Sequence, residues 1–262
     1  MTEAPAPTDT REPASPAPSE LTIWIWRGNR ETGREEAYTV ALQPGMVVLD
    51  AVHYVQAHHA PDLAVRWNCK AAHCGSCSAE VNGRPRLLCK TRVDEYVRKG
   101  EEIHVEPMKT FPVVRDLVPD VGSNYAVARR IPAYQPSSPP PFRLWQRDVD
   151  RVQEFRRCIE CFLCQDVCHV LREHGLTEQY MGPRYMAKLA ELAMNPMDAR
   201  DRVPFVKAEG GVDWCNITRC CSEVCPEAIE ITNNAIIPLK ERVADRYWDP
   251  IRRLWGRPRA DT

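Results

Sequence analysis

The alternation of hydrophobic and polar residues near the N-terminus predicts a β-hairpin followed by a helix. Leu21–Trp26 is rich in the β-branched and aromatic residues that favour strands, and Ala37–Leu42 alternates well enough to be its hairpin partner. Val48–His59 carries valines at helical spacing and is predicted as a helix.

A second hairpin is predicted further along the same half of the chain. Ser78–Val81 and Arg86–Cys89 flank the pair Asn82-Gly83, which favours a tight type I′ turn. Ile103–Glu106 is expected to be the closing strand. Strands and one helix in this order indicate an α+β domain over residues 21–108.

Prolines and helical patterns divide the remainder of the chain. The prolines of the middle stretch that lie within ten residues of one another are Pro132, Pro136, Pro139, Pro140 and Pro141. Residues 109–147 are therefore expected to be an extended, proline-rich connector rather than a helix. Beyond it, Arg184–Met194 and Ala235–Arg246 have helical patterns, with Pro238 tolerable only near a first helical turn. Since no strand-rich segment follows, residues 148–250 are predicted to form an all-α domain.

Composition narrows the class of protein. Hydrophobic residues make up 44% of 262 residues, enough for globular cores, and the formal net charge of −1 argues against a nucleic-acid partner. No apolar run reaches about 18 residues, so we expect no transmembrane helix, and any membrane contact would be made through another chain. Residues 1–20 are expected to be a disordered tail without an export signal. Residues 251–262 form a basic tail that is either solvated or in contact with anionic lipid headgroups.

Twelve cysteines are the most informative feature of the composition. Without an export signal, they indicate metal ligation by thiolates rather than disulfides. The first group, Cys69-x4-Cys74-x2-Cys77-x11-Cys89, has the plant-type [2Fe–2S] spacing. Gly75 suits the close backbone approach that such a loop needs.

Two other kinds of metal site use cysteine groups of this size. A zinc site of four cysteines usually contains paired C-x2-C elements, and only one such pair occurs here. A Rieske site needs two histidines in place of two cysteines, whereas all four cysteines are present beside His73. The spacing favours a [2Fe–2S] cluster.

The second half of the chain contains two related cysteine runs. The first run is Cys158-x2-Cys161-x2-Cys164-x3-Cys168, the spacing of bacterial ferredoxins. Overlaying this template on the second run gives Cys215, Thr218, Cys221 and Cys225, so threonine replaces the second cysteine.

The overlay predicts the cluster ligands, because the fourth cysteine of each run in two-cluster ferredoxins binds the other cluster. The predicted [4Fe–4S] ligands are Cys158, Cys161, Cys164 and Cys225. The predicted ligands of the other cluster are Cys168, Cys215 and Cys221. A cubane that lacks one thiolate readily lacks that iron, which indicates [3Fe–4S]. Cys220 leaves an alternative open: it is either a thiol near this cluster or a substitute fourth ligand that makes it [4Fe–4S].

These three groups, in this order, resemble the iron–sulfur subunit of the succinate dehydrogenase and fumarate reductase family. The other stretches that carry the resemblance are Arg66-Trp67-Asn68-Cys69, Cys74-Gly75-Ser76-Cys77, Phe111–Leu117 and Cys225-Pro226. The resemblance implies a β-grasp, plant-type ferredoxin-like domain followed by an all-α dicluster ferredoxin-like domain. It implies electron transfer from the FAD of a flavoprotein subunit through [2Fe–2S], [4Fe–4S] and [3Fe–4S] clusters to quinone at a membrane-anchor subunit.

The resemblance also implies a location and leaves a direction open. It places the chain peripherally on the cytoplasmic face of the inner (plasma) membrane, within a complex and without a succinate site of its own. Succinate oxidation is the expected direction, and fumarate reduction by the same route is the alternative. A ferredoxin-like carrier of another flavoprotein reductase and a zinc-binding interaction module are the remaining rivals.

The predicted quinone contacts are the least specific part of the resemblance. Many family members have a proline after the fourth cysteine of the first run and tryptophans soon after, whereas this chain has His169 and no tryptophan there. Glu173, Asn216 and Thr218 occupy matching positions and are the candidate quinone-site residues. His169 is either a proton carrier or an ordinary surface histidine.

Overall fold

A computed structural model describes residues 20–249 of the chain. The expected N-terminal tail, apart from Glu20, and the expected basic tail lie outside this range. Within it, no helix combines the length and the apolar character needed to cross a membrane.

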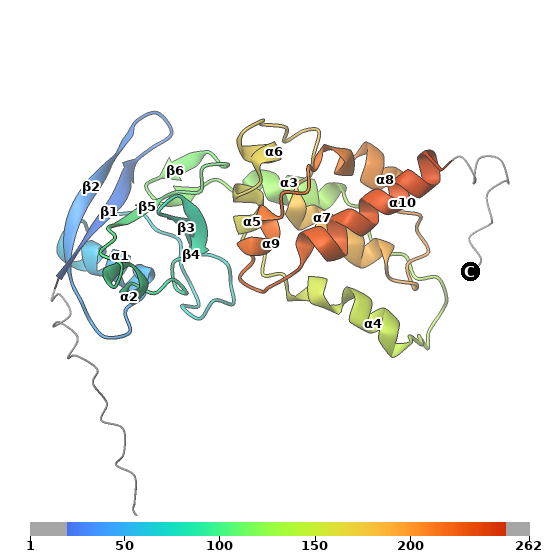
Figure 1. Ribbon diagram of the computed structural model, residues 1–262, viewed down its shortest axis with the longest axis horizontal. Helices are drawn as coiled ribbons and strands as arrows, with labels where there is room; N and C mark the ends of the chain where they lie inside the picture. The colour runs from blue at the N-terminus through green and yellow to red at the C-terminus, as the bar shows by residue number, and fades with distance from the viewer. Residues whose placement is uncertain (1–19, 250–262) are drawn as a thin grey trace, which may run out of the picture.

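The N-terminal half is built on a five-stranded mixed sheet with strand order β2-β1-β5-β3-β4 (Figure 1). Its strands are β1 (Glu20–Gly28), β2 (Gly33–Ala41), β3 (Ser78–Val81), β4 (Arg84–Leu87) and β5 (Ile103–Glu106). Strands β1 and β5 are parallel, and the other neighbours are antiparallel. Helix α1 (Val48–His58) buries its apolar face in the core of this half, and the short α2 (Asp94–Val97) precedes β5. The fold agrees with the predicted α+β domain.

The predicted hairpins are confirmed, with shifted boundaries. Asn82 and Gly83 have φ angles of 49° and 70°, as a type I′ turn requires at both central positions. The two-residue turn pairs Val81 with Arg84, so β4 begins two residues earlier than predicted. In the first hairpin β2 begins at Gly33 instead of Ala37, because its ladder with β1 continues as far as Gly28.

The connector contains regular structure that the sequence analysis did not anticipate. Strands β6 (Val113–Arg115) and β7 (Val118–Pro119) form a small hairpin, and helix α3 spans Gly122–Arg130. The expectation that residues 109–147 are extended throughout is therefore wrong. The cluster of closely spaced prolines begins at Pro132 and restricts the chain from the preceding residue onward, and no proline lies within Gly122–Arg130, which is free to form a helix.

The proline-rich part of the connector is fastened to the helical half. The buried guanidinium of Arg202 donates to the carbonyl oxygens of Pro132 (2.6 Å) and Ala133 (3.0 Å). It also pairs with the buried carboxylate of Asp198 at 2.6 Å. These contacts satisfy the buried charges and fix the path of the connector.

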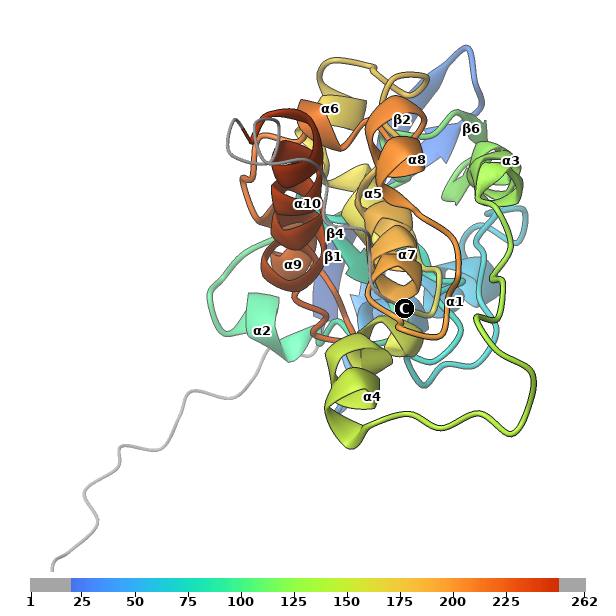
Figure 2. The same ribbon diagram turned by 90° about the vertical axis from the view of Figure 1, so that its right-hand side faces the viewer.

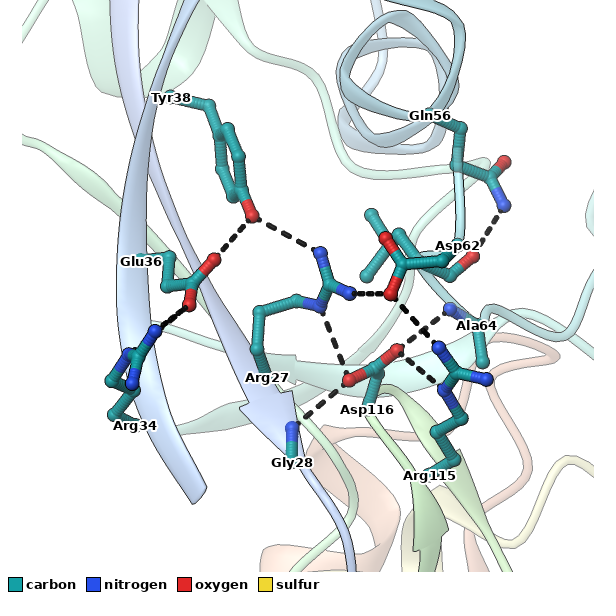
Figure 3. Close-up of polar contacts among 11 residues, drawn as sticks. Arg27, Gly28, Arg34, Glu36, Tyr38, Gln56, Asp62, Ala64, Arg115 and Asp116 are labelled. Atoms are coloured by element: carbon teal, nitrogen blue, oxygen red, sulfur yellow. Dashed lines mark hydrogen bonds and ion pairs between the residues drawn. The ribbon is translucent and has the colours of Figure 1, made fainter. Parts of the chain in front are cut away.

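A buried carboxylate fastens the β6–β7 hairpin to the main sheet (Figure 3). Asp116 accepts hydrogen bonds from Arg27 Nε (3.2 Å), the Gly28 amide (2.9 Å) and the Ala64 amide (2.9 Å). Arg27 also donates to the exposed carboxylate of Asp62 at 2.7 Å. One carboxylate thus joins β1, the segment after α1 and the connector.

We expect Asp116→Asn to lower the free energy of unfolding by about 1–3 kcal/mol, because it weakens charge-assisted hydrogen bonds in a buried site. The measurement is the midpoint of anaerobic urea unfolding, followed by far-ultraviolet circular dichroism. Asp62→Asn is the matched control, since the exposed Asp62 pairs with the same arginine and should contribute less than about 1 kcal/mol. Equal midpoints for the two variants would contradict this prediction.

The C-terminal half is helical, with α7 at its centre (Figure 2). Its α-helices are α4 (Gln146–Gln153), α5 (Leu163–Asp166), α6 (His169–Arg172), α7 (Pro183–Ala193), α8 (Val203–Ala208), α9 (Cys220–Glu223) and α10 (Ile237–Tyr247). Met186 and Leu189 of α7 are completely buried in the core of this half. The prediction of helices at Arg184–Met194 and Ala235–Arg246 is confirmed, with Pro238 in the first turn of α10. A π-helical turn, Ile231–Ile236, precedes α10.

The two halves share part of one hydrophobic core. Cys161, Phe162 and Leu163 come from the helical half, yet they are buried in the core of the sheet-containing half. The ring of Phe162 packs edge-on against Phe111 of the connector, with a centroid distance of 6.4 Å. The shared core fixes one half against the other.

Polar groups buried at the same junction are also paired. Glu80 on β3 is fully buried and accepts a hydrogen bond from Arg172 of α6 at 2.8 Å. Asp166 of α5 accepts a hydrogen bond from the Thr110 amide at 3.0 Å. Burial, together with the neighbouring Glu80 carboxylate, raises the pKa of Asp166 to about 7.

Candidate metal centres

All twelve cysteines lie within residues 20–249 as free thiols, and they gather at three places. The first place is the loop between α1 and β3, together with Cys89 after β4. The other two are cavities between the short helices of the C-terminal half.

The loop of the first site is shaped by left-handed backbone. Its residues with positive φ are Lys70 (55°), Ala72 (60°) and Gly75 (67°). The loop curls around Cys69, so that the amide nitrogens of Ala71 and His73 lie 3.4 Å and 3.3 Å from its sulfur. Backbone N–H groups directed at sulfur are a suitable environment for an anionic iron–sulfur cluster.

The four thiols of the first site differ in exposure. Cys77 and Cys89 are buried, whereas Cys69 and Cys74 are partly exposed. Burial raises the pKa of Cys77 to about 12. Burial acts in the same direction on Cys74, but hydrogen bonds from Ser76 and Cys69 outweigh it and lower the pKa of Cys74 to about 6. A cluster held here would have one edge toward the surface and one edge toward the core.

One cavity is lined by the four cysteines that the overlaid template assigns to the [4Fe–4S] cluster. They are Cys158, Cys161, Cys164 and Cys225. Three of them come from one run. The fourth, Cys225, follows α9, and its sulfur lies 3.4 Å from the Ile229 amide nitrogen. The fold thus brings the four predicted ligands to one cavity, and their coordination of a cluster stays a prediction.

The second cavity is lined by the three cysteines assigned to the [3Fe–4S] cluster, and by Cys220. The three are Cys168, Cys215 and Cys221. The Cys220 sulfur lies 3.4 Å from the Val167 carbonyl oxygen and 3.3 Å from Thr218 Oγ1. The Cys220 thiol thus lies beside this cavity, which is compatible with both interpretations of Cys220.

The two runs have the same backbone conformation, which supports their overlay. The second and fourth residues after the first cysteine have left-handed φ angles in both runs: Glu160 (54°) and Phe162 (62°), and Ile217 (61°) and Arg219 (67°). A short helix begins at the next residue in each run, at Leu163 in α5 and at Cys220 in α9. Cys220 thus corresponds to Leu163, whose position is not a ligand position of the template.

The chemistry of the buried thiols fits a metal-containing group. Burial raises the pKa of Cys161 and of Cys221 to about 12 and that of Cys168 to about 11, and it also raises the pKa of Cys164 well above its ordinary value. Unpaired thiolates are therefore costly here, and bound iron would supply the positive charge that offsets this cost. In the described part of the chain, no three His, Cys, Asp or Glu side chains are arranged to hold a single metal ion.

The first and second sites are in direct contact. A Cβ atom on Gly75 would lie 2.8 Å from Cys161 Cα, so only glycine allows the two loops to approach this closely. Ser78 Oγ lies 2.9 Å from the carbonyl oxygens of both Gly75 and Cys161. The two sites also meet next to Cys89 and Cys225, where Lys90 Nζ donates to the Pro226 carbonyl oxygen at 2.9 Å.

The candidate quinone residues are only partly brought together. Asn216 and Thr218 line the second cavity with His169, and Asn216 Nδ2 lies 3.0 Å from His169 Nε2. Glu173 is exposed, pairs with Arg172 at 3.4 Å and is not among the residues lining that cavity.

Two site residues were missed by the sequence analysis. Arg184 lines the cavity of Cys158, and Tyr180 lines the cavity of Cys215. Neither belongs to a cysteine run, and their proximity to the thiols depends on the packing of α7, so no local sequence signal indicates them.

Two family models match the chain in the order expected from the cysteines. Residues 20–125 match a 2Fe-2S iron-sulfur cluster binding domain. Residues 154–229 match a 4Fe-4S dicluster domain. Each match contains the cysteine groups described above, so the expected succession of one ferredoxin-like domain and one dicluster domain is confirmed.

Similar proteins have been described in several bacteria. The chain is 32% identical to a fumarate reductase iron-sulfur subunit of Mycobacterium tuberculosis, over 74% of this chain and 80% of that protein. It is 29% identical to the fumarate reductase iron-sulfur subunit of Haemophilus influenzae, over 80% of this chain and 88% of that protein. Among solved structures, a chain of the Mycobacterium smegmatis Sdh1 complex in the apo form matches with 54% identity and a TM-score of 0.86. That match covers 88% of this chain and 98% of that chain.

Proposed function

This chain belongs to the family of iron–sulfur subunits of fumarate reductase and succinate dehydrogenase, and we propose that it carries electrons between a flavoprotein subunit and membrane quinone. The bound clusters would supply the one-electron chemistry, and the protein would position them and exclude water. The flavoprotein would hold FAD and the dicarboxylate substrate, so this chain needs no succinate site of its own.

The proposed ligands follow the three groups of thiols. Cys69, Cys74, Cys77 and Cys89 hold a [2Fe–2S] cluster. Cys158, Cys161, Cys164 and Cys225 hold a [4Fe–4S] cluster. Cys168, Cys215 and Cys221 hold a [3Fe–4S] cluster. Thr218, at the position of the missing cysteine, supplies no thiolate, which supports the three-iron form.

The observation that carries the proposal is the continuity of the three sites. The loops of the first two sites touch at Gly75 and Cys161. The second and third sites share the first cysteine run, because Cys164 lines one cavity and Cys168 lines the other. Clusters held at these positions would form an uninterrupted series along the molecule.

Exposed aromatic residues at the two ends of this series support docking of two partners. Trp67, beside the first site, is 47% exposed, and Lys70 Nζ lies 4.8 Å from the centre of its indole. Trp214 and Ile217, beside the third site, are also exposed. We assign the first surface to the flavoprotein and the second to a membrane-anchor subunit, on the cytoplasmic face of the inner membrane.

The test is electron paramagnetic resonance with redox titration of the intact complex. We expect signals from three different clusters, including a [3Fe–4S] signal in the oxidised state, and stoichiometric FAD in a co-purifying subunit. Zinc without iron or acid-labile sulfide would establish the zinc-module alternative. Isolation as a monomer without a FAD-containing partner would favour the carrier alternative. Cluster potentials that lie below the potential of the quinone would favour succinate oxidation, which is our proposed direction. Potentials above that of the quinol would favour fumarate reduction.

We expect Cys220→Ser to leave all three clusters in place, because Cys220 matches Leu163 rather than a ligand in the repeated backbone pattern. Iron and sulfide content should stay at the wild-type level, and the [3Fe–4S] signal should persist. If the variant loses the iron and sulfide of the third cluster, or if the oxidised wild-type complex has full iron content but no [3Fe–4S] signal, Cys220 is a ligand of that cluster.

A further inference from the structure

Each of the two cavities in the helical half contains one buried hydrogen-bond donor that makes no hydrogen bond of normal geometry within the protein. Tyr180 is 1% exposed, and its hydroxyl makes no such bond, although it interacts with the side chain of Cys215, a predicted cluster ligand. The Arg184 side chain is 11% exposed, and its Nε atom is buried and likewise unpartnered. An unpaired buried donor is costly, which indicates that a bound group accepts these hydrogen bonds.

Both donors belong to one short segment, Tyr180–Arg184, that enters α7. Tyr180 lines the cavity of Cys168, Cys215 and Cys221, whereas Arg184 lines the cavity of Cys158, Cys161, Cys164 and Cys225. This one segment therefore contributes a residue to each of the two cavities.

The buried amide of Gln165 holds this segment against the cysteine run. Gln165 lies between Cys164 and Cys168; its Nε2 donates to the Met181 carbonyl oxygen at 3.1 Å. Its Oε1 accepts from the Arg184 amide at 3.3 Å. A Cβ atom on Gly182 would lie 2.0 Å from the same Oε1, so glycine is required for this contact. The donors are thus fixed relative to the ligands of both cavities.

The remaining contacts of Arg184 leave its Nε–H available. Its Nη2 donates to Glu160 Oε1 at 2.6 Å, which orients the guanidinium group. A guanidinium stays charged in proteins, and a phenol carries its proton at neutral pH, so both groups are donors under working conditions.

We propose that Tyr180 and Arg184 are positioning residues that each donate a hydrogen bond to a sulfur atom of the neighbouring cluster and raise its reduction potential. Reduction adds negative charge to a cluster, and donors or positive charge near its sulfur atoms stabilise the reduced form. The inference rests on the proposed function, because it requires clusters in both cavities.

The test is a potentiometric titration of each cluster by electron paramagnetic resonance in Tyr180→Phe and Arg184→Gln complexes. Tyr180→Phe should lower the equilibrium constant for one-electron reduction of the third cluster about tenfold. This lowers the midpoint potential of that cluster by about 59 mV and should leave the potential of the second cluster unchanged. Arg184→Gln should weaken reduction of the second cluster at least tenfold and leave the third unchanged. Each variant is therefore the control for the other.

An unchanged midpoint of the adjacent cluster at full iron and sulfide content, in either variant, overturns the assignment for that donor. If Arg184→Gln fails to retain the second cluster, Glu160→Gln replaces it as the test. Removing that carboxylate keeps Arg184 and should raise the potential of the same cluster, and an unchanged potential overturns the proposal. Absence of cluster signals in the wild-type complex would instead refute the proposed function.

Discussion

Replacing Gly75 with alanine is expected to lower the free energy of unfolding by about 2–5 kcal/mol and to separate the first two metal sites. Gly75 has a φ angle of 67°, which a residue with a side chain adopts only at a cost. Its Cβ would also lie 2.8 Å from Cys161 Cα and 2.9 Å from the Ile159 carbonyl oxygen. Because both of these neighbours are backbone atoms, the loops must move apart.

Gly100→Ala is the matched control for this prediction. Gly100 has a φ angle of 66°, and a Cβ there would have no atom within 4 Å, so the variant isolates the backbone cost. The measurements are the midpoint of anaerobic unfolding and the rate of electron transfer from the first cluster to the second. We expect both to fall further in Gly75→Ala, and the prediction is wrong if the two variants are equally stable and equally fast.

Replacing Cys164 with alanine is expected to abolish the [4Fe–4S] cluster and interrupt electron transfer to quinone. The thiol is buried in the core of the helical half, and no other cysteine lines its cavity besides the three remaining proposed ligands. The iron content should fall by the four irons of that cluster, and the complex should be less stable, since cluster binding contributes to folding.

The measurements for Cys164→Ala are iron and sulfide content, and quinone reduction by the intact complex compared with electron transfer to an artificial acceptor. Cys220→Ser is the control, because it removes a thiol of α9 that lines the other cavity and is not a proposed ligand. A Cys164→Ala complex with full iron content and normal quinone reduction would refute the assignment of this ligand.

Local sequence signals predicted most of the fold. The Asn82-Gly83 pair fixed a two-residue turn, and Pro238 marked the first turn of α10, because each of these features depends on neighbouring residues only. Helix α3 was missed because the proline rule was applied to the whole connector. The cluster of closely spaced prolines starts at Pro132, so it terminates α3 rather than prevents it.

The candidate sites divide in the same way. The thiols that cysteine spacing groups together line the same cavities, because ligands of one cluster recur at fixed intervals within a run, and Cys220 lines the second cavity as well. Their roles as ligands stay predictions. The contact between Gly75 and Cys161 joins residues far apart in the chain, and the donors Tyr180 and Arg184 reach their cavities through the packing of α7. Such features depend on tertiary structure, so a single sequence carries no pattern for them.

The core shared by Cys161, Phe162 and Leu163 with the sheet-containing half constrains how the gene can change. A chimaera that joins the two halves of different proteins within the connector would pack Phe162 against a surface from another protein. Substitutions on one side of the shared core must therefore be matched by substitutions on the other side. The electron-carrying modules of this protein are therefore expected to be inherited as one unit.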